Sequence, residues 1–190
     1  MNDFDYLAWI LSRDYICVDK SKMKEEKQAK GKRCQCVKIK MGRGIKSYDL
    51  YEFGSKDNFR LFPFFNHTNN EPNFPNAPSG LIAFCDYIIL TEFRNILYIL
   101  LIEMKRGETA HAHIQLEASK CFIEYVLCNA ERIKHHNSMA RFDKDKVEIR
   151  RIILSYTEKE TLNSHMPFKF NRNDVINYKA CAEFNIRDVI

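Results

Sequence analysis

The sequence predicts one α/β domain with a central mixed β-sheet of about four or five strands flanked by helices. Two strongly apolar segments, 81–90 and 96–105, are followed by a long helix candidate over 110–135 and by a strand-like segment over 147–156. A hairpin followed by a helix and a further strand is typical of a mixed sheet with helices packed on it. The length of 190 residues, with 45% hydrophobic and 29% charged residues, is that of one ordinary globular domain.

The N-terminal part contributes one predicted helix and one predicted strand. Residues 3–13 carry apolar side chains near helical spacing, and Asp3 is placed to cap the helix. Residues 34–41 alternate charged and apolar side chains, as a half-buried strand does. The apolar segment 48–53 is too short to distinguish helix from strand. Residues 66–80 are rich in Asn and Pro and predict a loop.

The two apolar segments are predicted to be central strands covered on both faces, yet charged residues interrupt them. Asp86 lies in the first segment, and Glu103 and Lys105 lie at the end of the second. Because side chains alternate along a strand, Glu103 and Lys105 share one face. If Arg94 and Asn95 alone form the turn, Asp86 lies opposite Glu103, with Cβ atoms about 4.5–5.5 Å apart. A register shifted by one residue would move Asp86 to the other face.

Two carboxylates this close repel each other, and their burial requires compensating positive charge. Lys105 supplies one charge, and a divalent metal would supply the rest. Carboxylate oxygens suit Mg²⁺, which keeps several waters and shares its other positions with phosphate oxygens. Such a metal activates water and stabilises charge on a phosphodiester, while a lysine positions the nucleophile or the phosphate. The sequence therefore predicts a hydrolytic site with Asp86 and Glu103 as metal ligands.

The helix candidate places a polar residue in an apolar setting. Its predicted solvent side carries His113, Glu117, Lys120, Glu124, Glu131 and Lys134. Gln115 lies on the opposite side, where Ile114, Ala118, Phe122 and Tyr125 gather. A buried amide needs a hydrogen-bond partner. The site at Asp86, Glu103 and Lys105 would provide one, and so would a carbonyl in the core.

These residues resemble the PD-(D/E)XK, or restriction-endonuclease-like, nuclease superfamily, and most closely its RecB-like branch. The matching positions are Gly80 and Asp86, then the run Ile102-Glu103-Met104-Lys105-Arg106-Gly107, then Gln115-Leu116, within about residues 80–127. The resemblance implies a restriction-endonuclease-like fold and a Mg²⁺ or Mn²⁺ cofactor bound by Asp86 and Glu103. It also implies that Lys105 assists the attacking water and that Gln115 orients the site.

The sequence departs from the pattern of this superfamily at three points. Cys85 replaces the Pro that usually precedes the Asp, and Ser119 stands where a Tyr often follows the Gln. The acidic residue expected upstream is not marked by any motif, and Glu52 and Glu71 are the candidates for it. These departures bear on whether the site is active.

Positive charge is concentrated in residues 20–46, which hold eleven Lys or Arg and two Glu, a net charge of +9, whereas the other 163 residues carry −4. Its N-terminal part has no apolar face, which predicts a solvated arm or loop. Such a segment is a natural source of phosphate contacts. The predicted nucleic-acid-binding residues are Lys20, Lys22, Lys24, Lys27, Lys30, Lys32 and Arg33. DNA is the expected substrate over RNA, a choice that rests on the resemblance.

A cytoplasmic location is expected. The longest purely apolar run, 96–102, has seven residues, and a membrane-spanning helix needs about 20. The N-terminus lacks a basic-then-apolar signal pattern. Seven dispersed cysteines, an odd number, suit a reducing compartment. Cys34 and Cys36 are not predicted to bind zinc, because no second Cys/His pair at suitable spacing follows them.

The sequence thus predicts a Mg²⁺- or Mn²⁺-dependent deoxyribonuclease, a hydrolase that acts as a nuclease or endonuclease on DNA. The alternative is a catalytically inactive nuclease-fold module that binds nucleic acid or protein. The short chain also leaves room for a homodimer or for a partner protein that directs it to its target.

Overall fold

The computed structural model describes residues 3–11, 16–24, 36–52, 84–105, 110–136, 143–156, 174–180 and 183–190. Its helices are α1 (Asp3–Ile10), α3 (Ala110–His136) and the 3₁₀ helices η2 (Lys144–Lys146) and η3 (Ile186–Val189). Its strands are β1 (Lys22–Lys24), β2 (Cys36–Lys40), β3 (Tyr48–Glu52), β4 (Tyr87–Phe93), β5 (Ile96–Lys105), β6 (Val147–Tyr156), β7 (Val175–Ala180) and β8 (Glu183–Asn185). Among the described helices, none combines the length and the apolar character that a membrane span requires.

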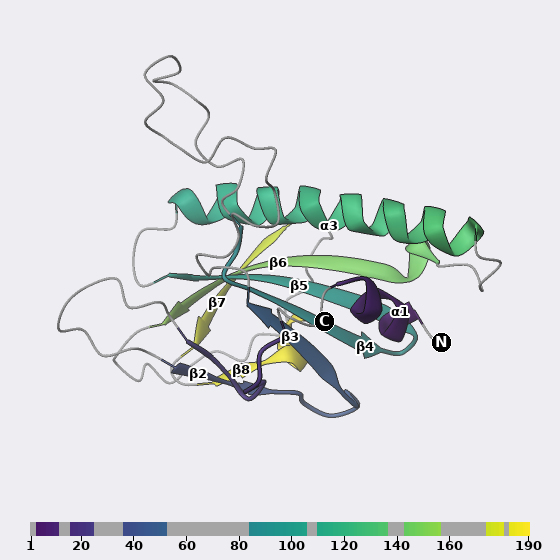
Figure 1. Cartoon of the computed structure of the whole chain (residues 1–190). Helices are drawn as coiled ribbons and strands as arrows, with labels where there is room; N and C mark the ends of the chain where they lie inside the picture. Colours follow the sequence, from purple (N-terminus) through teal and green to yellow (C-terminus); the bar gives the residue numbers. More distant parts are fainter. Residues whose placement is uncertain are drawn as a thin grey trace, which may run out of the picture.

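A five-stranded mixed sheet in the order β3-β4-β5-β6-β7 forms the centre of the molecule (Figure 1). Strands β3, β4 and β5 are antiparallel neighbours, whereas β5, β6 and β7 run parallel. Parallel neighbours need a long connection, and α3 lies between β5 and β6 in the sequence. The predicted α/β class, the hairpin, the helix over 110–135 and the strand over 147–156 are confirmed.

The β4–β5 hairpin turns through Arg94 and Asn95 alone. Both residues have positive φ, 52° and 63°, as both central residues of a type I′ turn require. This turn gives the predicted register, in which Tyr87 pairs with Ile102. The first strand was placed too early in the sequence: β4 starts at Tyr87 and runs to Phe93, so residues 91–93 belong to the strand and not to the connection.

Helices α1 and α3 cover one face of the large sheet, where they form a common core with it (Figure 1). A hydrogen bond links the two helices: the Tyr6 hydroxyl of α1 donates to the Ala130 carbonyl of α3 over 3.0 Å. The buried residues of α3 are Ala112, Leu116, Ser119, Ile123, Val126, Leu127 and Ala130. Their spacing of three and four residues forms one stripe toward the sheet.

The apolar side predicted for α3 was partly wrong. Ile114 is 49% exposed and Tyr125 is 67% exposed, so both lie on the outer side of the helix. Gln115 is half-buried at the edge of the buried stripe, next to Leu116. The side of α3 that packs on the sheet is instead the one that carries Leu116, Ile123 and Leu127.

The other face of the large sheet is covered by a second mixed sheet, β1-β2-β8, which the sequence did not predict, together with the 3₁₀ helix η3 (Figure 1). The predicted alternation in β2 is confirmed, with Val37 and Ile39 buried and the residues between them exposed. Residues 22–24 form a strand and not part of a solvated arm. Met23 anchors this strand with no exposed surface, but a single apolar residue carries no periodicity to detect.

Candidate active site

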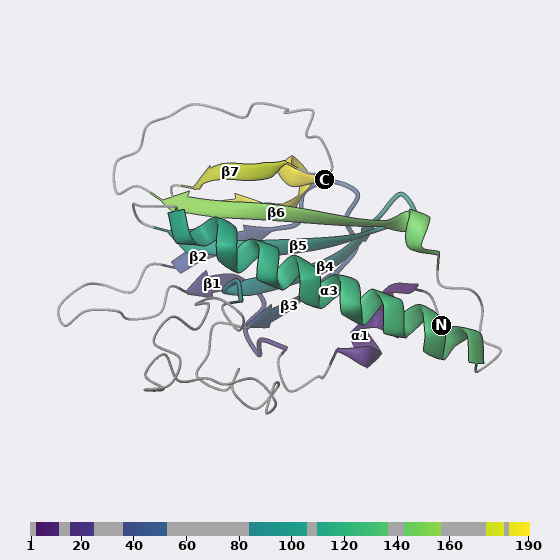
Figure 2. The ribbon, with the colours of Figure 1, turned by 90° about the horizontal axis from the view of Figure 1, so that it is seen from above.

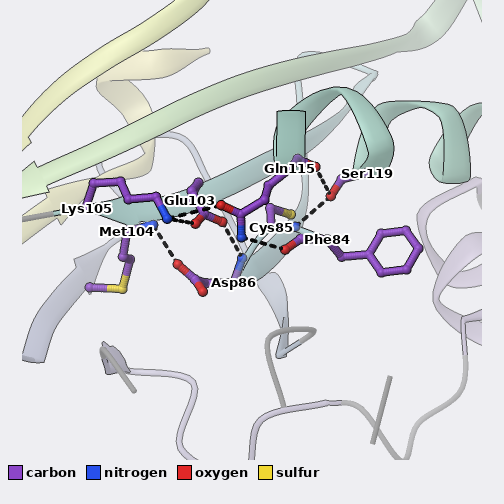
Figure 3. A network of polar contacts seen from close by, with 8 residues as sticks. All are labelled: Phe84, Cys85, Asp86, Glu103, Met104, Lys105, Gln115 and Ser119. Atoms are coloured by element: carbon purple, nitrogen blue, oxygen red, sulfur yellow. Dashed lines mark hydrogen bonds and ion pairs between the residues drawn. The ribbon is translucent and has the colours of Figure 1, made fainter. Parts of the chain in front are cut away.

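Asp86 and Glu103 meet where β4 begins and β5 ends (Figure 3). The β4–β5 ladder pairs Tyr87 with Ile102, and its next step brings Asp86 beside Glu103. The backbone N–H of Asp86 donates to Oε2 of Glu103 over 3.2 Å. In return, Oδ2 of Asp86 accepts from the Met104 N–H over 2.7 Å. The two acidic residues are therefore held together by backbone groups of both strands.

Glu103 is buried and lies on the sheet face covered by α3. Its side chain is 1% exposed, and its partner on β6 is Ile153 of the same core. Lys105 shares this face, and its Nζ lies 2.5 Å from Oε1 of Glu103. The Lys105 side chain remains 24% exposed. The site is thus closed at the glutamate and reachable from solvent at the lysine.

Gln115 of α3 completes the cluster (Figure 3). Its Oε1 accepts a hydrogen bond from Lys105 Nζ over 3.1 Å, and its Nε2 donates to the Phe84 carbonyl over 3.4 Å. The sequence left two hydrogen-bond partners possible for Gln115, the site and a core carbonyl, and its amide group contacts both. The structure brings together all four predicted side chains: Asp86, Glu103, Lys105 and Gln115.

Ser119, one turn further along α3, is a contact that the sequence prediction missed. Its hydroxyl is fully buried, donates to the Gln115 carbonyl over 2.8 Å and accepts from the Cys85 N–H over 2.7 Å. With the bond from Gln115 to Phe84, this fixes the segment that leads into Asp86. The available signal was a serine four residues after the glutamine, and therefore on the same side of the helix.

Burial, and after it the negative charge of Asp86, raise the pKa of Glu103 to about 7. The hydrogen bond and positive charge of Lys105 act in the opposite direction but do not cancel these effects. The carboxyl group consequently changes charge near neutral pH. A cation placed between Asp86 and Glu103 would favour the charged form of both.

The donor set suits a hard divalent cation. Within the described residues, no three His, Cys, Asp or Glu side chains gather into a group that could hold a metal ion. Zinc normally takes four protein ligands in structural sites, whereas Mg²⁺ is commonly bound through one or two carboxylates with waters and substrate phosphates. The pair Asp86 and Glu103 is a donor set of the kind that Mg²⁺ takes.

The candidates for an upstream acidic ligand do not join this cluster among the described residues. Glu52, the last residue of β3, pairs with Tyr87. Directly paired residues point to the same side of a sheet, and Tyr87 belongs to the core on the face away from α3. The ladder thus places Glu52 on the opposite face from Glu103. Glu71 lies outside the described residues.

The predicted nucleic-acid-binding residues fall into two groups. Lys20 is engaged by Asp49 at 2.5 Å, and Lys22 is paired with Asp19 at 2.8 Å. Lys24 is exposed, at the end of β1. The remaining four residues, Lys27, Lys30, Lys32 and Arg33, lie outside the described part of the chain.

No protein-family model, no curated protein and no solved structure matches this chain significantly.

Proposed function

We propose that this protein is a metal-dependent nuclease of the restriction-endonuclease-like class that hydrolyses phosphodiester bonds, with DNA as the preferred substrate. One observation carries the proposal. A glutamate that is 1% exposed lies beside a second acidic residue and a lysine, at the end of two central strands. Burying such a group is costly unless it is paired or binds a metal. Arrangements of this kind concentrate at functional sites.

The four residues of the site have different roles in this proposal. Asp86 and Glu103 would hold a Mg²⁺ or Mn²⁺ ion. When bound, such an ion lowers the pKa of a coordinated water and neutralises the charge that develops on the phosphate. Lys105 is partly exposed and donates to both Glu103 and Gln115, which orients its ammonium group toward the acidic pair. From there it positions the attacking water or the phosphate.

The fold is compatible with this assignment. The acidic pair lies on a hairpin, the glutamine on the helix that follows, and the next strand runs parallel to β5. The resemblance of the sequence implies an acidic pair on two strands followed by a glutamine on the next helix. The helix also shields Glu103 from solvent, which strengthens electrostatic interactions inside the site.

A non-catalytic binding module is the second candidate, and one observation favours it. The described residues supply only two carboxylates to the site, and Lys105 already neutralises Glu103 without a metal. A site of this composition can persist as a structural ion pair in a protein that binds nucleic acid without cleaving it.

Incubation with plasmid, linear duplex DNA, single-stranded DNA and RNA, each with Mg²⁺, Mn²⁺ or EDTA, separates the two candidates. The nuclease proposal predicts cleavage of DNA in Mg²⁺ or Mn²⁺ and none in EDTA. Binding of DNA without cleavage in either metal would support the module and contradict the nuclease.

A further inference from the structure

The outer side of the β1–β2 hairpin carries a set of lysines that the site does not use. Met23 and Val37 are paired and point inward, with 0% and 2% exposure. On the opposite side, Lys22 lies directly across from Lys38, and Lys24 lies across from Cys36. Lys40 follows on the same side of β2. We call these four lysines, Lys22, Lys24, Lys38 and Lys40, the lysine face.

The lysine face has an excess of positive charge. Lys22 is paired with Asp19 at 2.8 Å, and Lys40 with Glu183 at 2.7 Å. Glu183 is also the strand neighbour of Lys38, but its carboxylate is engaged by Lys40. Within the described residues, neither Lys24 nor Lys38 has a carboxylate partner. Lys24 and Lys38 therefore leave positive charge on this face that a bound anion would neutralise.

A tyrosine fixes this face relative to the candidate active site. The Tyr87 hydroxyl accepts from the Lys24 N–H over 2.9 Å and donates to the Lys24 carbonyl over 2.7 Å. Tyr87 is 3% exposed and directly follows Asp86 in the chain. Strands β1 and β2 and the first turn of α3 lie toward the same end of the large sheet (Figure 1 and Figure 2). Lys24 is therefore separated from the start of β4 by one tyrosine side chain.

We propose that the lysine face binds the phosphate backbone of the nucleic acid on which the candidate active site acts. The inference rests on the proposed function and extends it. It adds Lys38 to the residues predicted to bind nucleic acid and excludes Lys20, which is paired with Asp49. The outward side chains of β1 and β2 include no aromatic or aliphatic residue that could insert into a lipid surface. A nucleic-acid backbone, which is bound through its phosphate charges, therefore suits this surface better than a lipid membrane does.

Binding of a fluorescently labelled 20-base-pair duplex, measured by anisotropy in EDTA over a range of salt concentrations, tests the proposal. The variant Lys24→Gln/Lys38→Gln should bind at least tenfold more weakly at low salt. The slope of log K against log salt should fall by about 1.8, because two phosphate contacts are lost. The control Lys120→Gln/Lys146→Gln removes the same charge from α3 and η2 and should bind as wild type. Tyr87→Phe removes both bonds to Lys24 and should weaken binding to a smaller extent.

Circular dichroism melts confirm that each variant is folded before its affinity is compared. Equal affinity and salt slope in the Lys24→Gln/Lys38→Gln variant and wild type would overturn the proposal. An equal loss of duplex affinity in the Lys120→Gln/Lys146→Gln control would also overturn the proposal. Binding of the protein to anionic vesicles but not to the duplex would overturn it as well. Because no metal is present, failure of cleavage does not affect this measurement. If the wild type and the Lys24→Gln/Lys38→Gln variant both cleave DNA with the same KM, the role of the lysine face is refuted while the proposed nuclease function stands.

Discussion

The backbone N–H of Asp86 donates to Oε2 of Glu103 over 3.2 Å. The Asp86 carboxylate accepts from the next residue on β5, Met104, over 2.7 Å. The two acidic residues are therefore held in place by the strands themselves. Because these hydrogen bonds come from the backbone, a substitution that keeps the shape of the side chain can separate effects on chemistry from effects on folding.

The first prediction concerns pH and stability. Folding raises the pKa of Glu103 from 4.5 to about 7. The native state therefore binds this proton more tightly than the unfolded chain, so the stabilisation is present below about pH 4.5 and is lost as pH rises through 7. Glu103→Gln removes this dependence. In EDTA, its free energy of unfolding should exceed that of wild type by up to about 3 kcal/mol at pH 8, with the difference vanishing near pH 4. Urea unfolding of wild type and Glu103→Gln at several pH values measures this difference in unfolding free energy.

A second prediction tests the buried hydroxyl of Ser119. Ser119→Ala leaves the buried Cys85 N–H without its acceptor at 2.7 Å. The cost should be about 1–3 kcal/mol of unfolding free energy. Ser155→Ala is the matched control, since the Ser155 hydroxyl only reaches the Tyr178 carbonyl at 3.5 Å in a half-buried position. Equal losses in the two variants would contradict the role given to Ser119.

The hairpin turn provides a third prediction. Asn95 has a φ of 63°, which a β-branched residue adopts only with strain. Asn95→Val should cost about 1–3 kcal/mol of stability, whereas Asn95→Gly should be neutral or stabilising, because glycine is the favoured residue at this position of a type I′ turn. Thermal melts of both variants measure the difference. A valine variant as stable as the glycine variant would contradict the turn and the register that depends on it.

A fourth prediction separates Lys105 from the metal ligands. Lys105→Ala removes the ammonium group that contacts Glu103 and Gln115, so DNA cleavage should be lost while Mn²⁺ affinity, measured calorimetrically, stays close to wild type. Lys120→Ala, which breaks an exposed pair with Glu124, should leave cleavage unchanged. An exposed pair is worth about 0–1 kcal/mol. Cleavage that survives Lys105→Ala would remove this lysine from the chemistry.

The central hairpin could be predicted from the sequence because its signals are strong and local. The apolar runs mark the strands, and the two-residue turn fixes which residues face each other, so the approach of Asp86 to Glu103 followed from the register alone. The contact of Gln115 with Lys105 was one of two alternatives that the sequence left open, and the side of the helix assigned to Ile114 was wrong.

The second sheet could not be predicted because its pairings are non-local and its strands are short. Strands β1 and β8 have three residues each, which is too few for a periodic pattern. The parallel pairing of β2 with β8 joins Lys38 to Glu183, far apart in the chain. The hydrogen bond from the Lys24 N–H to the Tyr87 hydroxyl joins residues that are also far apart in the chain. Predictions for residues 66–80 lie outside the described residues.

Cleavage by wild type and by Glu103→Gln, measured side by side in Mg²⁺ with a Mn²⁺ binding titration on the same preparations, tests the central claim most directly. The substitution keeps the shape of the side chain but removes a ligand charge. The account predicts metal-dependent cleavage by the wild type, loss of both cleavage and tight metal binding in the variant, and a folded variant in EDTA. Cleavage or metal affinity that persists unchanged in Glu103→Gln would contradict the assignment of this acidic pair as the metal site of a nuclease.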